Sequence, residues 1–274
     1  MTSTDPAAER VSAIAELWSD GDYRRTAALF APVSDRLAAE WGREGLRVLD
    51  AATGTGNTAL AFARTGAEVD AFDLTPALLA IARQRAETEG HAIRFREGDL
   101  VDIPYDDARF DLVVSTFGAF LVDRPYDCAR ELVRVCRPDG AVVTTGWAAG
   151  GVIGSFVVAL SEFHPDFVDP DRADTLQWSD PDRVPDLFAG LGVEVSLEQR
   201  TAWFPAASVE DAMTLFEAAA APVIALRRAI TSAGADWQPM RDALLARWSD
   251  IARTTDDGIE LPSDYGVAVV RPTG

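Results

Sequence analysis

Two glycines and an acidic residue near position 50 form the most informative group in this chain. The run VLDAATGTGN covers residues 48–57, with Asp50 before a turn that contains Gly54 and Gly56. Glycine lets backbone N–H groups approach a ligand closely, and the start of the following helix adds further N–H groups. The loop therefore predicts a site for a nucleoside-containing cofactor. The spacing Gly54-x-Gly56-x-x-Ala59 also fits the dinucleotide-binding fingerprint, so the residues of the loop leave the cofactor class open.

Three acidic residues at predicted strand ends narrow the class of cofactor that the loop could bind. Asp73 follows Gly54 by 19 residues and suits a ribose diol, which both kinds of cofactor carry. Asp99 could accept a hydrogen bond from the exocyclic amine of adenine, beside the backbone N–H of Leu100. Asp50 would repel a pyrophosphate but would tolerate a ligand with an amino group and a sulfonium. For each acid taken singly, a solvated loop carboxylate or a helix cap is the alternative.

Strands and helices that alternate along the chain must bring these residues together. Apolar runs predict strands at 46–50, 67–72, 93–97, 110–115 and 141–146. Helical patterns lie between them at 57–65, 76–89 and 125–137. This alternation is typical of an α/β protein with a doubly wound, mostly parallel sheet, in which ligands bind at the carboxyl ends of the strands.

The flanking segments follow a different pattern. Residues 7–40 predict a pair of helices, broken at Gly21-Asp22. After the fifth strand, helices are predicted at 150–163, 181–190, 208–230 and 236–252, and strands at 193–203 and 266–271. We expect a single domain over 1–274, with a helical cap (1–42), a cofactor-binding core (46–147) and a substrate-side region (148–274).

Composition excludes several classes of partner. The formal net charge of −19 opposes binding to phosphate backbones, so no nucleic-acid partner is expected. The apolar stretches are too short to cross a bilayer, and the polar start has no signal segment, so a cytoplasmic location without a membrane partner is predicted. Since no cysteine or histidine cluster has metal-ligand spacing, no metal is expected.

Five motifs together carry a resemblance to a known family. They are VLDAATGTGN, AFDLTP, FREGDL, DLVVSTFGAF and RELVRVCRPDG. Over about residues 46–147 the chain resembles the class I S-adenosylmethionine-dependent methyltransferases, especially the small-molecule enzymes similar to those of ubiquinone and menaquinone biosynthesis (methyltransferase type 11/25). The resemblance implies a seven-stranded Rossmann-like sheet of order 3-2-1-4-5-7-6, with an antiparallel last strand and an insert after strand five. One departure is Ala52, where the family usually has its first glycine.

The resemblance also implies a site for S-adenosyl-L-methionine. The loop Ala52–Gly56 would pass under the methionine moiety, Asp73 would bind the ribose, and Leu74 would lie against the adenine. Ser115 and Thr116 would face the methionine end or the transferring methyl group. The implied cofactor-binding set is Asp50, Ala51, Ala52, Thr53, Gly54, Gly56, Asn57, Asp73, Leu74, Asp99, Leu100, Ser115 and Thr116.

Residues for the chemical step are harder to assign from sequence. Methyl transfer is an in-line displacement, in which proximity and alignment do most of the work and a base is needed only for some acceptors. His164 is a candidate base or substrate contact, with a helix-end histidine as the alternative. Tyr23 is a second candidate, because GDYRRTAALFAP resembles the family's cofactor-covering helix. Aromatic candidates for the substrate pocket, each also explained by core packing, are Trp18, Phe117, Phe120, Phe163 and Trp178.

These observations predict methyl transfer from S-adenosylmethionine to a small-molecule metabolite in a closed, largely apolar pocket, by a monomer or a homodimer. Two alternatives stay open. One is a protein of this fold that binds the cofactor but catalyses a reaction other than methylation. The other is an NAD-dependent oxidoreductase, which would share the glycine loop and Asp73 but would leave Asp50 and Asp99 unexplained.

Overall fold

One mixed sheet forms the centre of the molecule. The computed structural model describes residues 12, 15–18, 22–167 and 175–273. In it the strands have the order β3-β2-β1-β4-β5-β8-β6, with β7 paired to β8. The strands are β1 (Arg47–Ala51), β2 (Glu68–Asp73), β3 (Arg94–Glu97), β4 (Phe110–Thr116), β5 (Cys136–Gly150), β6 (Val193–Ala206), β7 (Arg253–Thr255) and β8 (Gly258–Pro272). The first five strands are parallel, and β8 runs antiparallel to both β5 and β6.

This arrangement confirms the predicted fold class and strand order, with β8 in the place of the predicted strand seven. The strand count is corrected from seven to eight. The additional strand, β7, has three residues, which is too short to give a periodic signal in the sequence. It pairs with the start of β8 around a turn at Gly258.

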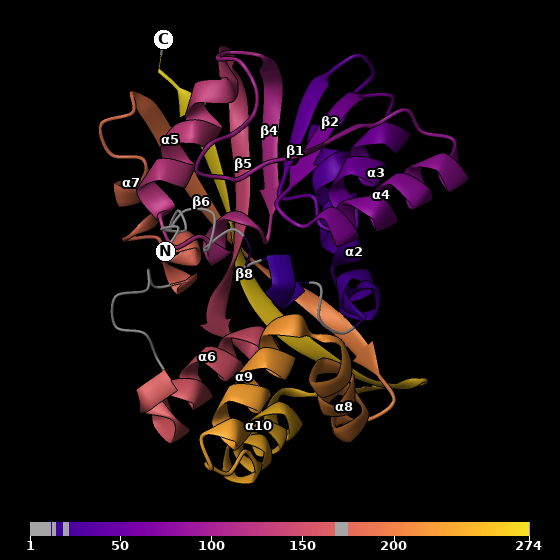
Figure 1. Ribbon diagram of the computed structural model, residues 1–274, viewed down its shortest axis with the longest axis vertical. Coiled ribbons are helices and arrows are strands. Elements are labelled where there is room, and N and C mark those ends of the chain that lie inside the picture. The colour runs from indigo at the N-terminus through magenta and orange to yellow at the C-terminus, as the bar shows by residue number, and fades with distance from the viewer. Residues whose placement is uncertain (1–11, 13–14, 19–21, 168–174, 274) are drawn as a thin grey trace, which may run out of the picture.

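Helices cover both faces of the sheet and also form a separate group beyond its edge (Figure 1). Their bounds are α2 (Tyr23–Trp41), α3 (Asn57–Arg64), α4 (Pro76–Glu89), α5 (Pro125–Val135), α6 (Gly151–Phe163), α7 (Val184–Leu187), α8 (Val209–Ala219), α9 (Ala221–Ser232) and α10 (Gln238–Ile251). Side chains of α2 and α3 share one core with β1 and β5, whereas α5 and α7 pack in a second core on the opposite face.

Several helix ends differ from the sequence prediction for local reasons. The segment predicted as one helix over 208–230 is α8 followed by α9, and Pro222 stands in the first turn of α9. Proline cannot continue the previous helix but is well suited to a first turn, which explains the break. The helix predicted to end at 137 ends at Val135, because β5 begins at Cys136.

Three long strands carry the chain beyond the parallel sheet. The pairing of β4 with β5 ends at Thr116 and Thr145, and β5 then continues to Gly150. The pairing of β6 with β8 runs from Val193 opposite Pro272 to Ala206 opposite Ile259. Helices α6, α8, α9 and α10 lie around these extensions, below the carboxyl ends of the parallel strands (Figure 1). The fold therefore places a second group of helices opposite the edge where the glycine loop lies.

Candidate cofactor site

Asp50 organises the glycine loop between β1 and α3. Its Oδ2 accepts hydrogen bonds from Thr53 Oγ1 at 2.6 Å and from the backbone N–H of Ala59 at 2.8 Å. The side chain is buried, and this burial, together with the negative charge of Asp73, raises the pKa of Asp50 to about 7. The backbone adopts positive φ at Ala52 (62°), Gly54 (54°) and Gly56 (87°). The loop is therefore a fixed turn, and Ala52 holds a left-handed conformation that favours glycine.

Asp73 holds the other side of the same loop. Its Oδ2 accepts from the backbone N–H of Gly54 at 2.7 Å, and its Oδ1 accepts from the N–H of Thr75 at 2.8 Å. Thr75 is the N-cap residue of α4, and its own side chain makes no capping hydrogen bond. Burial also raises the pKa of the Asp73 carboxyl. The Thr75 hydroxyl and the Leu74 N–H also face this carboxylate, so a ribose diol would share it with donors of the protein.

The end of β4 packs directly against this loop. Ser115 Oγ donates to the carbonyl of Ala51 at 2.9 Å and accepts from the N–H of Ala119 at 3.1 Å. A Cβ placed on Gly118 would lie 2.5 Å from the Cβ of Ala52, so only glycine fits there without a shift. Both polar functions of Ser115 therefore serve to join the strand to the loop.

Thr116 and Asn57 also bond to protein groups. Thr116 Oγ1 accepts from Thr58 Oγ1 at 2.9 Å. Asn57 Nδ2 donates to the carbonyl of Ala27 at 2.7 Å, and its Oδ1 accepts from Arg85 Nη1 at 2.8 Å. These bonds connect the loop and β4 to the helices α2, α3 and α4.

The residues after β3 and β2 border the loop on the adenine side of the expected site. Asp99 Oδ1 accepts from the N–H of Val101 at 3.2 Å, and Leu100 is buried. Leu74, directly after Asp73, is half-buried. The parallel register brings Gly98 beside the end of β2, where its N–H donates to the carbonyl of Asp73 at 3.1 Å.

Tyr23 covers the glycine loop from the start of α2. A Cβ on Gly54 would lie 3.8 Å from Cε1 of the Tyr23 ring. Burial raises the pKa of the Tyr23 hydroxyl, and the negative charge of Asp73 raises it further. Trp18 packs edge-to-face on Tyr23, with ring centroids 5.0 Å apart. Two of the residues predicted for the site thus lie together above the loop.

Phe117 belongs to an aromatic cluster beneath α2. Its ring stacks on Trp147 with centroids 3.7 Å apart, and Phe30 contacts both rings. The backbone of Phe117 has a φ of 56°, an unusual value that recurs at functional sites. Trp147 and Phe30 were not singled out in the sequence, although Trp147 directly follows the predicted fifth strand. The remaining members of the cluster are Phe204 and Tyr265.

The other candidates lie in different parts of the fold. Phe120 is half-buried and packs against both cores. Trp178 is fully buried against Phe188 and the backbone of β5, in the core on the opposite face. Phe163 and His164 lie at the end of α6, about 20 Å along the helix axis from the end of β5. We therefore find Trp18 and Tyr23 at the loop, and Phe163 and His164 distant from the end of β5.

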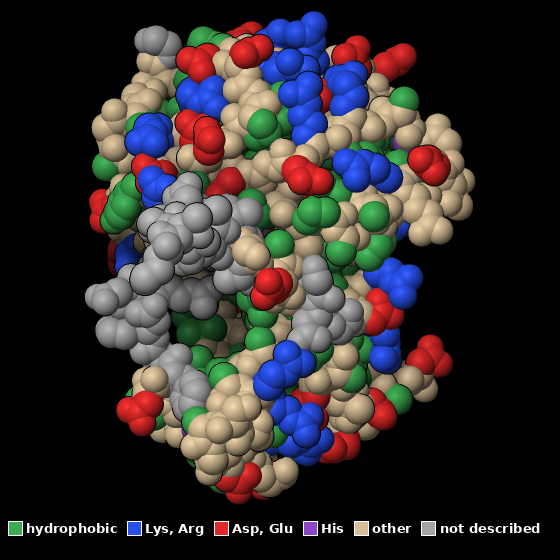
Figure 2. All heavy atoms as spheres, viewed as in Figure 1, with side chains coloured by type: hydrophobic (Ala, Val, Ile, Leu, Met, Phe, Trp, Pro, Cys, Tyr) green, Lys and Arg blue, Asp and Glu red, His purple; other side chains and the backbone are tan. Residues whose placement is uncertain are grey.

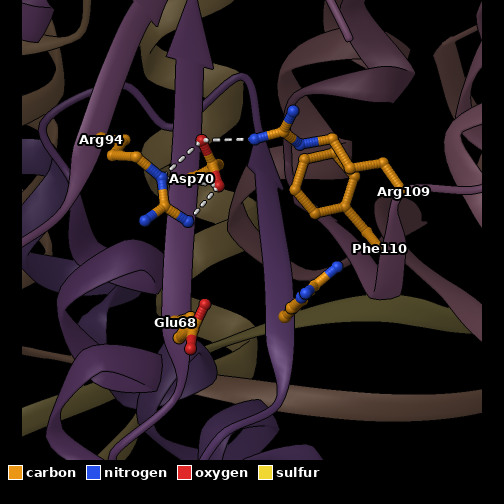
Figure 3. Close-up of a pocket in the computed structure, with 6 residues that line it drawn as sticks. Glu68, Asp70, Arg94, Arg109 and Phe110 are labelled. Carbon is orange, nitrogen blue, oxygen red and sulfur yellow. Dashed lines mark hydrogen bonds and ion pairs between the residues drawn. The ribbon is translucent and has the colours of Figure 1, made fainter. Parts of the chain in front are cut away.

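A pocket of about 460 Å³ lies at the opposite edge of the sheet (Figure 3). Its lining includes the first residues of four strands, so it lies at their amino ends. The buried carboxylate of Asp70 bonds to Arg94 at 2.6 Å and lies 3.9 Å from Arg109. The arginines neutralise a buried charge there, at the end of the sheet opposite the glycine loop.

The surface of the molecule also has a hollow elsewhere. Figure 2 shows it between the sheet and the lower helices, with hydrophobic side chains at its floor. Within the described ranges, no group of three histidine, cysteine or acidic residues could hold a metal ion. In the same part of the chain, no helix combines the length and hydropathy needed to cross a membrane.

Comparisons with known proteins agree with this geometry. The family model described as "Methyltransferase domain" matches residues 49–144. Two uncharacterized Mycobacterium bovis proteins, Mb1440c and Mb1438c, are 36% and 35% identical over 60% and 69% of this chain. The match spans 62% of the length of Mb1440c and 70% of that of Mb1438c. The demethylmenaquinone methyltransferase of Thermus thermophilus is 45% identical over 35% of this chain and 45% of its own length.

A solved structure shares the fold over most of the chain. The YcgJ protein of Bacillus subtilis has a TM-score of 0.59 and 19% identity, over 88% of this chain and 99% of that protein. Residues 49–144 therefore form a methyltransferase domain, and the chain has the fold of the class I methyltransferases, as the sequence motifs predicted.

Proposed function

We propose that this protein transfers a methyl group from S-adenosylmethionine to a small, largely apolar molecule. The observation that carries the proposal is the pair of buried carboxylates, Asp50 and Asp73, that flank one glycine loop. Burial raises the pKa of both carboxyls, and the negative charge of Asp73 raises the pKa of Asp50 further. A cationic ligand with a ribose would relieve this strain of like charges, whereas a pyrophosphate would increase it.

The residues present fit such a cofactor. The Tyr23 ring lies against the loop at Gly54, and the carboxylate of Asp73 on the other side of the loop could accept from a ribose diol. Asp99 and Leu100 would border the adenine. When bound, S-adenosylmethionine supplies an electrophilic methyl group on a sulfonium.

The residues of the chain would align the cofactor with the acceptor and exclude water from both. Tyr23 and Trp18 would cover the cofactor, and the cluster around Phe117 would support the acceptor side. Holding two reactants in line contributes about 7–11 kcal/mol in well-oriented systems, which is enough for a nucleophilic acceptor. The apolar floor of the hollow and the net charge of −19 both support a small molecule rather than a nucleic acid as acceptor.

Ligand binding tests the cofactor part of this proposal. We expect S-adenosylhomocysteine, but not NAD, to raise the melting temperature of the protein in a thermal-shift assay. Stabilisation by NAD alone would instead support an oxidoreductase.

Product formation tests the reaction. The protein would be incubated with S-adenosylmethionine carrying a labelled methyl group and a panel of small apolar acceptors with oxygen, nitrogen or carbon nucleophiles. Label in an acceptor, with equal release of S-adenosylhomocysteine, would support methyl transfer. Conversion of an acceptor without transfer of label would indicate a non-methylating reaction. The substitution His164→Gln tests that residue, because a base would leave its pKa in the pH profile of turnover.

A further inference from the structure

Arg85 on α4 directs its hydrogen bonds to the glycine loop. Its Nη1 donates to the carbonyl of Thr55 at 2.6 Å and to Oδ1 of Asn57 at 2.8 Å. Both acceptors are neutral oxygens, and the guanidinium is half-buried. Burial lowers the pKa of Arg85 and the charge of Glu89 opposes this effect, while its hydrogen bonds go to neutral oxygens of the loop and of α3.

Asn57 connects Arg85 to α2 through a second hydrogen bond. Its Nδ2 donates to the carbonyl of Ala27 at 2.7 Å, while Arg85 occupies its Oδ1. Because Arg85 can only donate, it fixes which end of the Asn57 amide faces α2. Ala27 lies four residues, about one helical turn, after Tyr23. The bond thus holds the turn of α2 that carries the ring above Gly54.

The packing of α4 on the loop supports the same role for Arg85. A Cβ on Gly56 would lie 3.0 Å from the Cβ of Ala82, so α4 touches the loop closely at that point. Ala82 and Arg85 are three residues apart and share one face of α4. Ala82 therefore provides the close approach, and Arg85 provides the polar link.

Pro32 interrupts the helical hydrogen bonds between the two halves of α2, and the first half packs through Phe30 and bonds through Ala27. Proline has no N–H, so the helical hydrogen bond from residue 32 to the carbonyl of residue 28 is missing inside α2. The half after Pro32 is held by other bonds, namely Ser34 to Thr58 at 2.9 Å and Glu40 to Arg200 at 2.9 Å. The bond from Asn57 to Ala27 lies on the other side of the proline.

We propose that Arg85 and Asn57 are positioning residues of the cofactor site, which hold the first turn of α2 so that Tyr23 covers the glycine loop. The inference rests on the proposed function and deepens it. Asn57, expected from sequence to bind the cofactor, acts through α2 in this assignment.

The test compares the affinity and the dissociation rate of S-adenosylhomocysteine among variants. We expect Arg85→Met to weaken binding about tenfold, mainly through faster dissociation, since about 1.4 kcal/mol corresponds to a tenfold change. Asn57→Asp still accepts from Arg85 but cannot donate to Ala27, so a similar loss is expected. Arg85→Lys should recover part of the affinity. The matched control is Arg83→Met, an exposed arginine on the same helix with one 3.5 Å contact to Phe95, which should bind like the wild type.

Measurements on a protein that already carries Tyr23→Ala separate a positioning role of Arg85 from general damage to the fold. If Arg85 acts through Tyr23, Arg85→Met should have little further effect on binding when Tyr23→Ala is already present. An equal loss in both backgrounds would overturn the route through Tyr23. Unchanged binding by Arg85→Met and Asn57→Asp would overturn the inference while leaving the proposed function intact. Failure of the wild type itself to bind S-adenosylhomocysteine would contradict the proposed function.

Discussion

The substitution Asp50→Asn should change how stability depends on pH. Both hydrogen bonds to Asp50 end on one oxygen, so an asparagine carbonyl can accept them from Thr53 and Ala59 with the same geometry. The variant therefore removes the titrating group and leaves the loop in place. It isolates the effect of burying this carboxyl on the free energy of unfolding.

The expected size follows from the pKa. Burial raises the pKa of Asp50 from 3.8 to about 7, so the folded protein binds a proton more tightly than the unfolded chain does. The free energy of unfolding must then fall as the pH rises between these two values. At 1.36 kcal/mol per unit, Asp50 should cost the wild type about 3 kcal/mol between roughly pH 5 and pH 8. Asp50→Asn has no carboxyl to titrate at this position, so the free energy of unfolding of the variant should rise relative to that of the wild type over this pH range.

Urea unfolding of both proteins at several pH values would measure this difference. Subtracting one curve from the other cancels the contributions of the remaining acidic groups. Asp106→Asn, which removes an exposed carboxylate, controls for the loss of one negative charge. A difference between Asp50→Asn and the wild type that stays constant from roughly pH 5 to pH 8 would refute the reasoning, because Asp50 would then be ionised throughout.

Two further substitutions and one labelling experiment have defined outcomes. Gly118→Ala places a Cβ 2.5 Å from that of Ala52 and should lower the free energy of unfolding by about 1–3 kcal/mol. Adding Ala52→Gly should restore part of this stability. A lack of rescue in urea titrations would contradict the contact. Asp73→Asn turns an amide NH₂ towards a backbone N–H, so calorimetry should show binding of S-adenosylhomocysteine weakened about tenfold or more; unchanged affinity would remove Asp73 from the site. Burial raises the pKa of the Cys128 thiol and raises that of Cys136 to about 12, so both should react with a thiol reagent only as fast as the protein unfolds; rapid labelling of the native protein would show an accessible thiolate.

Local sequence patterns were sufficient for the parallel half of the sheet. Apolar runs ending at Asp50 and Asp73, with turns after them, define strands whose carboxyl ends must meet at one edge. That register brings Asp73 beside the glycine loop, where its side chain accepts from the N–H of Gly54. These features depend on residues that are close in sequence, which is why the patterns predict them.

The rest depends on contacts between distant segments. The direction of the Asn57 amide is set by Arg85, 28 residues later, and by Ala27, 30 residues earlier. The strand predicted at 266–271 extends over Gly258–Pro272 because β6 offers a partner along its whole length. Pro222, by contrast, was visible in the sequence as a helix boundary within 208–230. The direction of the Asn57 amide and the full length of β8 therefore needed the three-dimensional structure, whereas the helix break at Pro222 did not.

The place of β8 in the sheet has a consequence for the order of folding. β8 lies between β5 and β6 and pairs with both, although β6 precedes it in the chain by more than fifty residues. Until β8 forms, β6 has no neighbouring strand to complete its hydrogen bonds, and the edge of β5 remains open. An unpaired strand of 14 residues is prone to association with other chains. The late insertion of β8 is thus the step at which this protein is most exposed to misassembly during refolding.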